Sequence, residues 1–149
     1  MAGRGARVCR SDETIGAAAF DERTRCPFCA RIDAGELLEA DGTAVAFPDA
    51  VPVTRGHALV APRRHVPDLL DLDDEEYLDM WRLARVLCRR FGGELGADGF
   101  NLGVNVGPAA GQTVPHVHLH VMPRYLDDVD DPRGGVRWIF PRKAEYWLK

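Results

Sequence analysis

The sequence predicts an α+β domain in which an antiparallel sheet packs with one long helix and a shorter N-terminal helix. Two observations carry this prediction: several short apolar runs are bounded by turn residues, and one segment has apolar residues at helical spacing. With 149 residues the chain can bury a core and is most simply one domain. We expect a flexible leader over 1–25, the domain over 26–126, and a C-terminal tail over 127–149 that packs on the domain or on a dimer partner.

The first elements follow from local signals. Cys26 opens a turn or short helix that ends near Gly35. Strands are expected over 36–39 and 43–47, because an Asp-Gly pair between two apolar runs is a strong hairpin signal. Another strand is expected over 57–61, where a proline then stops it.

The long helix has the clearest start signal. Asp73 and Glu76 stand three residues apart, as in a capping box with Asp in place of Ser or Thr. Apolar residues then repeat at helical spacing until Gly92-Gly93, which we expect to end the helix. The repeating residues are Tyr77, Met80, Trp81, Ala84, Leu87, Cys88 and Phe91. We expect this stripe to be core, with Trp81 and Cys88 as packing residues.

The composition excludes several classes of function. The net charge is −4, so no overall basic field favours nucleic acid or an anionic membrane. No apolar run approaches the length that spans a bilayer. We expect a cytoplasmic protein, in which the four cysteines stay reduced unless a metal binds them.

Three histidines, His116, His118 and His120, alternate with apolar residues. In an extended chain, alternate side chains leave the same face, so one strand would present three imidazoles in a row. Imidazole is suited to act as a nucleophile, a proton carrier or a metal ligand near neutral pH. His57 and His65 flank another expected strand, and pairing of the two strands would bring the histidines together.

Cys26 and Cys29 form a Cys-x-x-Cys pair. By itself this pair fits a zinc site, a redox dithiol or two small buried residues. A redox pair usually begins a helix after a strand, and no strand is expected before this one. A tetrahedral zinc site needs two more ligands, and histidines are the available complement.

A strand expected over 100–106 leads into a loop over 107–113 that is made of small, uncharged residues. The exposed amides of such a loop suit a phosphate, although the loop lacks the Gly-Lys-Ser/Thr ending of a P-loop. Because the loop directly precedes the row of histidines, it suggests a phosphate held where a neutral imidazole attacks it. The product would be a phosphorus–nitrogen intermediate that water then opens.

The pattern of residues 116–122 resembles the signature of the histidine triad (HIT) superfamily, and the resemblance covers about residues 26 to 124. Further segments match motifs of the superfamily in order, namely Phe47-Pro48-Asp49, residues 56–65, Asn105 and residues 110–114. The resemblance implies a HIT-like fold and a nucleotidyl hydrolase or transferase that acts at the α-phosphate of a nucleotide. Residues 110–114 and Pro123-Arg124 are most similar to the fragile-histidine-triad branch, which cleaves dinucleoside polyphosphates such as diadenosine tri- and tetraphosphate.

The resemblance also assigns roles by position. His118 would be the nucleophile that forms a nucleotidyl-histidine intermediate, and His120 and His57 would contact phosphate oxygens. Gln112 and Thr113 would hold the α-phosphate and the leaving-group oxygens. The other implied substrate contacts are Asn105 and Gly111 at the phosphates, Asp49 at the ribose, and Phe28 and Phe47 against the base. Packing in the core is an alternative role for the two phenylalanines.

The resemblance further implies structural Zn²⁺. Bacterial members with a leading Cys-x-x-Cys bind zinc through that pair and two histidines, at the positions of Cys26, Cys29, His65 and His116. One histidine of the row then belongs to the metal and the other two to the substrate. Members of the superfamily commonly dimerise through the long helix and a sheet edge, so we expect a homodimer.

Other functions are alternatives. Thr113 stands where the phosphoramidase branch usually has Ser, which disfavours a phosphoramidate as the preferred substrate. The same site could still serve a nucleoside phosphoramidase, a dinucleotide phosphorylase or a nucleotidyltransferase. A zinc-bound nucleotide-sensing module is less favoured, because a sensor needs no nucleophile. Catalytic zinc is less favoured because ligation that includes cysteine closes a site.

The tail carries charged and aromatic side chains with two alternative roles each. Arg133 and Arg137 either reach distal phosphates or lie on the surface. Trp138, Tyr146 and Trp147 cover either the pocket or a dimer partner.

Overall fold

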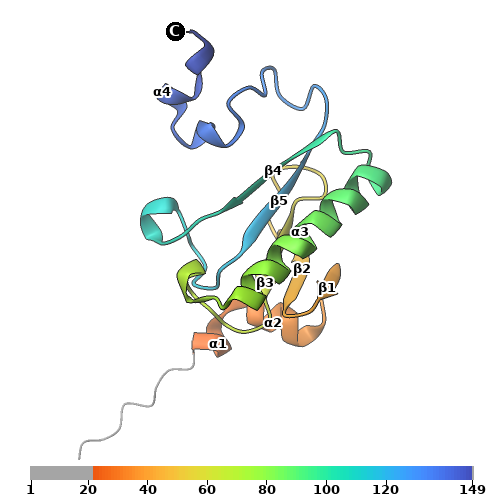
Figure 1. The fold of residues 1–149 in the computed structure, drawn as a ribbon, viewed down its shortest axis with the longest axis vertical. Helices are drawn as coiled ribbons and strands as arrows, with labels where there is room; N and C mark the ends of the chain where they lie inside the picture. The colour runs from red at the N-terminus through yellow and green to blue at the C-terminus, as the bar shows by residue number, and fades with distance from the viewer. Residues whose placement is uncertain (1–21, 149) are drawn as a thin grey trace, which may run out of the picture.

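The computed structural model describes residues 22–148, which form a five-stranded antiparallel sheet with helices on both faces (Figure 1). The predicted α+β class is confirmed. The strands lie in the order β1-β2-β3-β5-β4 and are β1 (Glu39–Asp41), β2 (Ala44–Pro48), β3 (Ala58–Pro62), β4 (Gly99–Val104) and β5 (Leu119–Arg124). The helices are α1 (Glu22–Arg25), α2 (Pro27–Ala34), α3 (Asp74–Glu94) and α4 (Pro141–Ala144), with 3-10 turns η1 (Leu69–Asp71), η2 (Pro108–Ala110), η3 (Gly135–Ile139) and η4 (Tyr146–Leu148).

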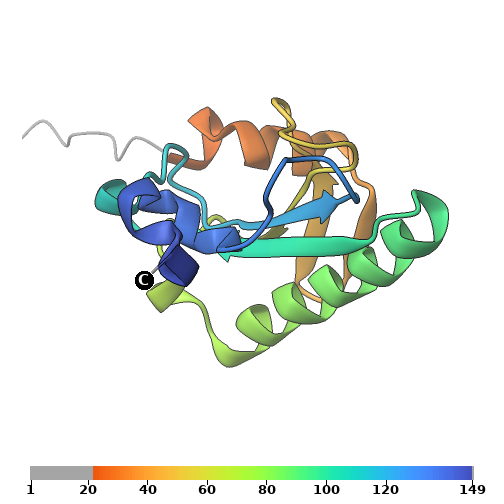
Figure 2. The ribbon, with the colours of Figure 1, turned by 90° about the horizontal axis from the view of Figure 1, so that it is seen from above.

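Different helices cover the two faces of the sheet (Figure 2). The long helix α3 packs on a face formed by alternate residues of the central strands, namely Ala44, Ala46, Ala58, Val60, Leu119 and Val121. The opposite face packs on α2 and the segment after it through Val45, Phe47, Leu59 and Ala61. Because strand side chains alternate between faces, the even-numbered residues of β5 face away from α3.

The predicted capping box of α3 is confirmed, but the predicted end of the helix is wrong. The Asp73 carboxylate accepts from Glu76 N (2.8 Å), and the Glu76 carboxylate accepts from Asp73 N (3.2 Å). The helix continues through both glycines to Glu94, because buried Phe91 anchors the last turn in the core. Gly96 instead takes the left-handed conformation that ends the chain's helical path (φ +66°).

The predicted core stripe of α3 is only partly correct. Met80, Leu83 and Leu87 are buried, whereas Tyr77 and Trp81 are 43% and 39% exposed. Trp81 is therefore not the core residue that the spacing predicted, because it lies at the border of the stripe. Cys88, also predicted to pack in the core, is half-buried against it.

The predicted hairpin is confirmed with a shifted first strand. Its first strand is β1 rather than residues 36–39, and Asp41 pairs with Ala44 across the turn. Gly42 occupies the turn with φ +54°, a conformation that glycine adopts without strain.

The predicted leader and tail are described in part. Residues 1–21 lie outside the described residues, and 22–25 form the single turn α1. After β5 the chain turns back, and η3 contacts β4. Among residues 22–148, no helix has both the length and the apolar character that crossing a bilayer requires.

Replacement of Leu83 by Ala is expected to lower the free energy of unfolding by about 2–5 kcal/mol, because Leu83 is fully buried between α3 and the sheet. Replacement of exposed Tyr77 by Ala is the control and should change it by no more than about 0.5 kcal/mol. Urea titration of both variants measures the difference. Equal losses would contradict the described register of α3.

Candidate active site and metal centre

The row of histidines lies on the sheet face opposite α3. β3 and β5 pair antiparallel with Leu59 opposite His120, as the sequence analysis required. His57 directly precedes β3 and is the diagonal neighbour of His120 on this face. Nε2 of His57 lies 3.0 Å from Nδ1 of His120. Strand pairing therefore joins two histidines that are 63 positions apart in the sequence.

Only the last histidine of the row belongs to a paired strand. β5 begins at Leu119, so the expectation of one strand with three imidazoles is wrong in its extent. Before that point Val117 N donates to Val66 O (2.7 Å), which gives this part of the chain a partner outside β3. Alternation still holds, because Val117 and Leu119 are buried on the other side.

The hydrogen bonds of His118 define which nitrogen is free. Its Nδ1 lies 2.8 Å from the carbonyl oxygen of His116. Because a carbonyl only accepts, Nδ1 carries the proton and donates it, which leaves the lone pair on Nε2. Burial lowers the pKa of His118, against opposing effects of that carbonyl and of Asp49, so the ring is neutral at pH 7.

Nε2 of His118 is also accessible. Among the described residues, Nε2 of His65 is the only buried side-chain nitrogen or oxygen atom that lacks a hydrogen-bond partner. Nε2 of His118 makes no hydrogen bond either, yet it is not among the buried atoms without a partner. It therefore keeps contact with solvent, although His118 as a whole is only 6% exposed. A neutral ring with an accessible lone pair can act as a nucleophile.

The other two histidines of this face form an ordered chain of donors. Val53 N donates to Nδ1 of His57 (3.3 Å), so the proton of His57 sits on Nε2 and points at His120. Nδ1 of His120 accepts it, which leaves an N–H on Nε2 of His120. Burial lowers the pKa of both rings, for His120 to about 4, although Asp49 opposes the shift in each case.

Asp49 follows β2 and lies beside this pair. Its Oδ2 is 3.5 Å from Nε2 of His57 and 4.0 Å from Nδ1 of His120, while Oδ1 accepts from Val51 N (2.8 Å). These three residues could hold a metal by residue type. However, the proton on Nε2 of His57 occupies the position a metal would need, so this arrangement favours hydrogen bonding to oxygen over coordination.

The loop after β4 is held by a side chain that the sequence analysis assigned to the substrate. The Gln112 amide donates to Pro67 O (2.7 Å) and Val114 O (3.1 Å), and its oxygen accepts from Gly107 N (2.8 Å). Gln112 and exposed Thr113 line a cavity of about 300 Å³ that does not include the histidines. Exposed Gly111 follows η2 with φ +86°. In the described structure Gln112 therefore braces the loop.

Asn105, which the sequence analysis assigned to the phosphates, directly follows β4. It lines the same cavity as His57 and His120, which has a volume of about 620 Å³. Gly103 pairs with His120 in the sheet, and open space lies where a side chain would stand. The sequence analysis did not identify Gly103 as part of the site, because a glycine within a strand often marks only a bend or a bulge.

The two predicted base-contacting aromatics differ in access. The Phe28 ring is half-buried and meets the His118 ring edge-on, with ring centres 5.0 Å apart. Phe47 is 0% exposed and packs against Phe28 at 5.1 Å. A base could therefore contact Phe28, while Phe47 supports that ring from the core.

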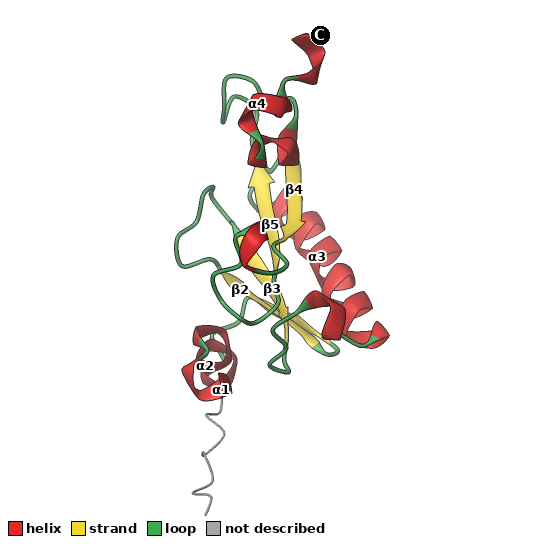
Figure 3. Ribbon diagram, turned by 90° about the vertical axis from the view of Figure 1, so that its left-hand side faces the viewer, coloured by secondary structure: helices red, strands yellow, loops and turns green. Residues whose placement is uncertain are grey.

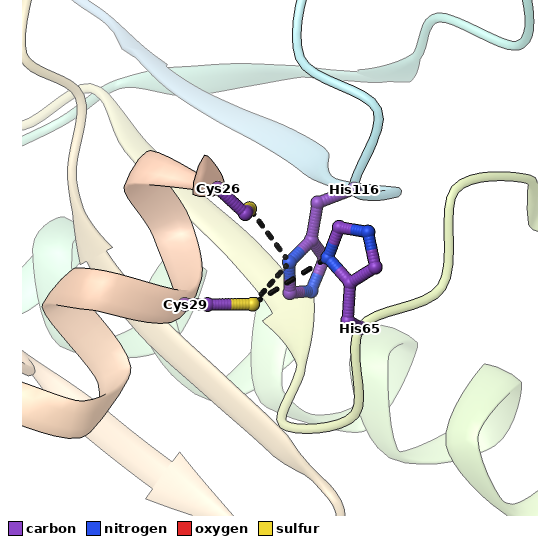
Figure 4. A group of neighbouring side chains, drawn as sticks. All are labelled: Cys26, Cys29, His65 and His116. Carbon is purple, nitrogen blue, oxygen red and sulfur yellow. Dashed lines mark hydrogen bonds between the residues drawn. The ribbon is translucent and has the colours of Figure 1, made fainter. Parts of the chain in front are cut away.

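A second cluster lies at the N-terminus of α2, where four predicted metal ligands converge (Figure 4). Nδ1 of His116 lies 3.4 Å from Sγ of Cys26 and 3.5 Å from Sγ of Cys29. Nδ1 of His65 lies 3.4 Å from Sγ of Cys29. Zinc bonds of about 2.3 Å to sulfur and about 2.05 Å to nitrogen give a tetrahedral S···N separation of about 3.5 Å. The four ligand atoms therefore stand at the spacing of a zinc site.

The surroundings of this cluster favour a cation. Nε2 of His116 donates to Pro62 O (2.9 Å), which turns the lone pair of Nδ1 toward both sulfurs. Burial raises the pKa of Cys29 to about 11, so a thiolate there needs a positive partner. The guanidinium of Arg64, the residue before His65, donates two hydrogen bonds to the carboxylate of buried Glu76 (2.8 and 2.6 Å). Its positive charge is therefore already paired. The Cys2His2 donor set fits a structural zinc ion.

Comparison with known proteins identifies related sequences. A family model described as the HIT domain matches residues 33–127. An uncharacterized HIT-like protein of Mycobacterium tuberculosis is 44% identical over 114 residues, which is 74% of this chain and 73% of that protein. The bifunctional bis(5'-adenosyl)-triphosphatase/adenylylsulfatase FHIT of Arabidopsis thaliana is 38% identical over 100 residues, covering 67% of this chain and 56% of that protein.

A related structure has also been solved. The crystal structure of a Zn-bound histidine triad family protein from Mycobacterium smegmatis is 34% identical, with a TM-score of 0.67. The match covers 85% of this chain and 96% of that chain.

Replacement of Cys29 by Ser is expected to remove bound zinc, because it deletes a sulfur that lies 3.4 Å from Nδ1 of His65 and 3.5 Å from Nδ1 of His116. Elemental analysis should find one zinc per wild-type chain and little in the variant. At free zinc 100-fold above the dissociation constant, the metal would stabilise the fold by about 2.7 kcal/mol, which unfolding with and without a chelator measures. Cys88→Ser is the control and should retain zinc. A wild-type protein that neither holds zinc nor responds to chelation would contradict the site.

Stability is expected to fall as the pH is lowered from about 6.5 to about 4. The ordinary pKa of histidine is 6.5, and that of His120 is about 4 in the folded chain, so in this range the unfolded chain binds a proton that the folded chain excludes. Below about 4 both states are protonated and the loss levels off. His120→Asn should reduce the loss, as measured by urea unfolding at pH 7 and 4.5. An identical loss in both proteins would argue against a neutral, buried His120.

Proposed function

The chain belongs to the HIT domain family, and on this premise we propose that it is a nucleotide hydrolase that cleaves dinucleoside polyphosphates at the α-phosphate. One observation carries the proposal. His118 is a neutral imidazole whose Nδ1 proton is bound by a backbone carbonyl and whose Nε2 lone pair is accessible. The name of the Arabidopsis relative, a bis(5'-adenosyl)-triphosphatase, supports a substrate of this class.

The first chemical step follows from this tautomer. Nε2 of His118 attacks the α-phosphorus, a phosphorus–nitrogen bond forms, and the bond to the bridging oxygen breaks. The leaving nucleotide departs with that electron pair as an anion. The imidazole then carries a positive charge, which the carbonyl of His116 stabilises through the Nδ1 proton.

The second step releases the product. Water attacks the same phosphorus, the phosphorus–nitrogen bond breaks, and its electron pair returns to Nε2 of His118. The water proton leaves to solvent, and a nucleoside monophosphate is released. The N–H on Nε2 of His120 would bind a phosphate oxygen through both steps. His57 donates its Nε2 proton to His120 and keeps that ring in this tautomer, so His57 would contact phosphate only by giving up that bond.

Further residues would bind the substrate around this centre. Asn105 lines the cavity next to the histidines, and Gly111 and Thr113 are exposed on the loop that precedes them. For Gln112 to bind phosphate, its amide must release its bonds to the loop. The Asp49 carboxylate, which lies 3.5 Å from Nε2 of His57, would instead accept hydrogen bonds from the ribose hydroxyls.

We infer that the metal is zinc and that its role is structural. Cys26, Cys29, His65 and His116 would hold it, and it would supply a fixed positive centre with no open coordination position. His116 contributes twice, because its ring faces the sulfurs and its carbonyl orients His118. A metal at this cluster would therefore fix the nucleophile two residues further along.

Related reactions would use the same covalent intermediate. Cleavage of a nucleoside phosphoramidate or of adenylyl sulfate changes only the leaving group, and phosphorolysis changes only the acceptor. The name of the Arabidopsis relative includes the adenylylsulfatase activity. Comparing turnover of diadenosine tetraphosphate, adenosine 5'-phosphoramidate and adenylyl sulfate, with and without inorganic phosphate, separates these reactions.

The homodimer remains our prediction. β4 lies at the edge of the sheet, and all six of its residues are half-buried in the described chain. Another strand could pair with this edge.

Replacement of His118 by Ala is expected to reduce kcat with diadenosine tetraphosphate by at least about 10³-fold, because no other accessible imidazole has a free lone pair in the right tautomer. Wild-type protein quenched in acid-free denaturant during turnover should carry a nucleotidyl adduct that mass spectrometry locates on His118. The control is Cys88→Ser, which should turn over normally. Full turnover by the His118 variant would refute the mechanism.

A further inference from the structure

The C-terminal segment walls the cavity that contains His57 and His120. The cavity of about 620 Å³ is lined on its far side by η3, including Val136, Trp138 and Ile139. Figure 3 shows the C-terminal segment beside β4 and β5, outside the part of the sheet that α2 covers. The volume lies within the range of small-molecule sites, about 300–1,000 Å³.

The cavity continues away from the histidines. A second cavity of about 470 Å³ shares Val53, Asn101, Met122 and Trp138 with the first. A ligand whose phosphate lies at His57 and His120 can therefore extend along one continuous wall toward Trp138. Val53, Met122 and Trp138 make the shared part of this wall mostly apolar, and Asn101 adds an amide.

Internal contacts fix the orientation of Trp138. Its indole Nε1 donates to the carbonyl oxygen of Arg133 (2.8 Å), so the polar edge of the ring is satisfied within the segment. Trp138 is 41% exposed, so part of the ring surface remains open. A tryptophan with a satisfied N–H and an open surface suits stacking by a flat aromatic ligand.

The arginines of the tail hold this wall in place. The Arg133 guanidinium lies 4.5 Å from the centre of the Trp147 ring, and that of Arg137 lies 5.2 Å from the centre of the Tyr146 ring. Arg133 also pairs with Asp131 at 2.8 Å. These contacts place both guanidinium groups against aromatic rings of the tail, where they support the segment that presents Trp138.

The bordering acidic residues are neutralised by partners. Asp128 pairs with Arg124 at 2.6 Å, and Asp131 pairs with Arg133. The wall therefore does not present a bare negative surface to a polyphosphate.

The two aromatic ends of the site stand on opposite sides of the histidines. Phe28 contacts the His118 ring, the His118 and His120 rings have centres 5.0 Å apart, and the His120 and His57 rings have centres 5.3 Å apart. The cavity with Trp138 begins beyond His57 and His120. A phosphate at the histidines would thus have one aromatic surface on the nucleophile side and another on the leaving-group side.

We propose that η3 and Trp138 form a subsite for the nucleobase of the leaving nucleotide, so that the C-terminal segment selects substrates that carry a second nucleoside. This proposal rests on the proposed function, because the hydrolase defines which nucleotide leaves. The occupant is a planar base attached to the distal phosphates.

The test compares two substrates that share the transferred adenylyl group. Diadenosine tetraphosphate carries a second base, whereas adenosine 5'-phosphoramidate releases only ammonia. Trp138→Ala should raise KM for diadenosine tetraphosphate by about tenfold or more, the effect of losing one stacked base, and leave the phosphoramidate within about twofold. Trp81→Ala is the matched control, because Trp81 is 39% exposed on α3, and it should alter neither substrate.

A binding measurement keeps the subsite testable without turnover. In a His118→Ala background, calorimetry with diadenosine tetraphosphate and with AMP should show that Trp138→Ala weakens only the dinucleotide, by about tenfold. If wild-type protein hydrolyses neither substrate but this difference persists, the proposed function fails and the subsite stands.

Three outcomes overturn the subsite. Equal losses on both substrates would mean that Trp138 supports the fold or the whole active site. No change on either substrate would mean that no base binds there. Loss of self-association in Trp138→Ala, seen by light scattering together with equal kinetic losses, would mean that a second copy of the chain occupies the wall.

Discussion

The hydrogen bond from Nδ1 of His118 to the carbonyl of His116 is the interaction on which the rest of the site depends. It decides the tautomer of the ring, and a neutral imidazole is a nucleophile only at the nitrogen that lacks the proton. The residue that supplies the carbonyl is itself fixed on its other side, since Nε2 of His116 donates to Pro62 O at the end of β3. The carbonyl of His116, the end of β3 and the Cys2His2 cluster thus together fix the orientation of the His118 ring.

Burial and charge act in opposite directions on the histidines, and burial prevails. Asp49 would favour protonation of His57 and His120, yet the pKa of each is lowered because both rings leave water. The result is a set of neutral rings whose donors and acceptors are ordered by hydrogen bonds. Such an order suits chemistry on phosphorus, where one ring must donate an electron pair while a neighbouring ring donates a hydrogen bond.

Much of this arrangement could be predicted from the sequence. Alternation of His116, His118 and His120, the hairpin signal and the capping box of α3 are short-range patterns, and they correctly indicated the elements and the convergence of the histidines. The resemblance correctly indicated the four residues that meet as Cys2His2. Trp81 was misplaced because spacing alone does not locate the border of a buried stripe.

Other parts left no signal in the sequence. The donor that orders His57 is the backbone N–H of Val53, and every residue except proline carries that group. The bonds that hold Gln112 to its own loop depend on distances that only the folded chain defines. The part played by Trp138 follows from where the chain turns after β5, which no local pattern dictates.

The match to the HIT domain ends at residue 127, while η3, which bears Trp138, lies beyond it. The histidines of the site and Trp138 therefore come from different stretches of the chain. Substitutions in η3 could change the surface of the cavity without altering the histidines. Proteins that share one reaction could thus come to accept different ligands.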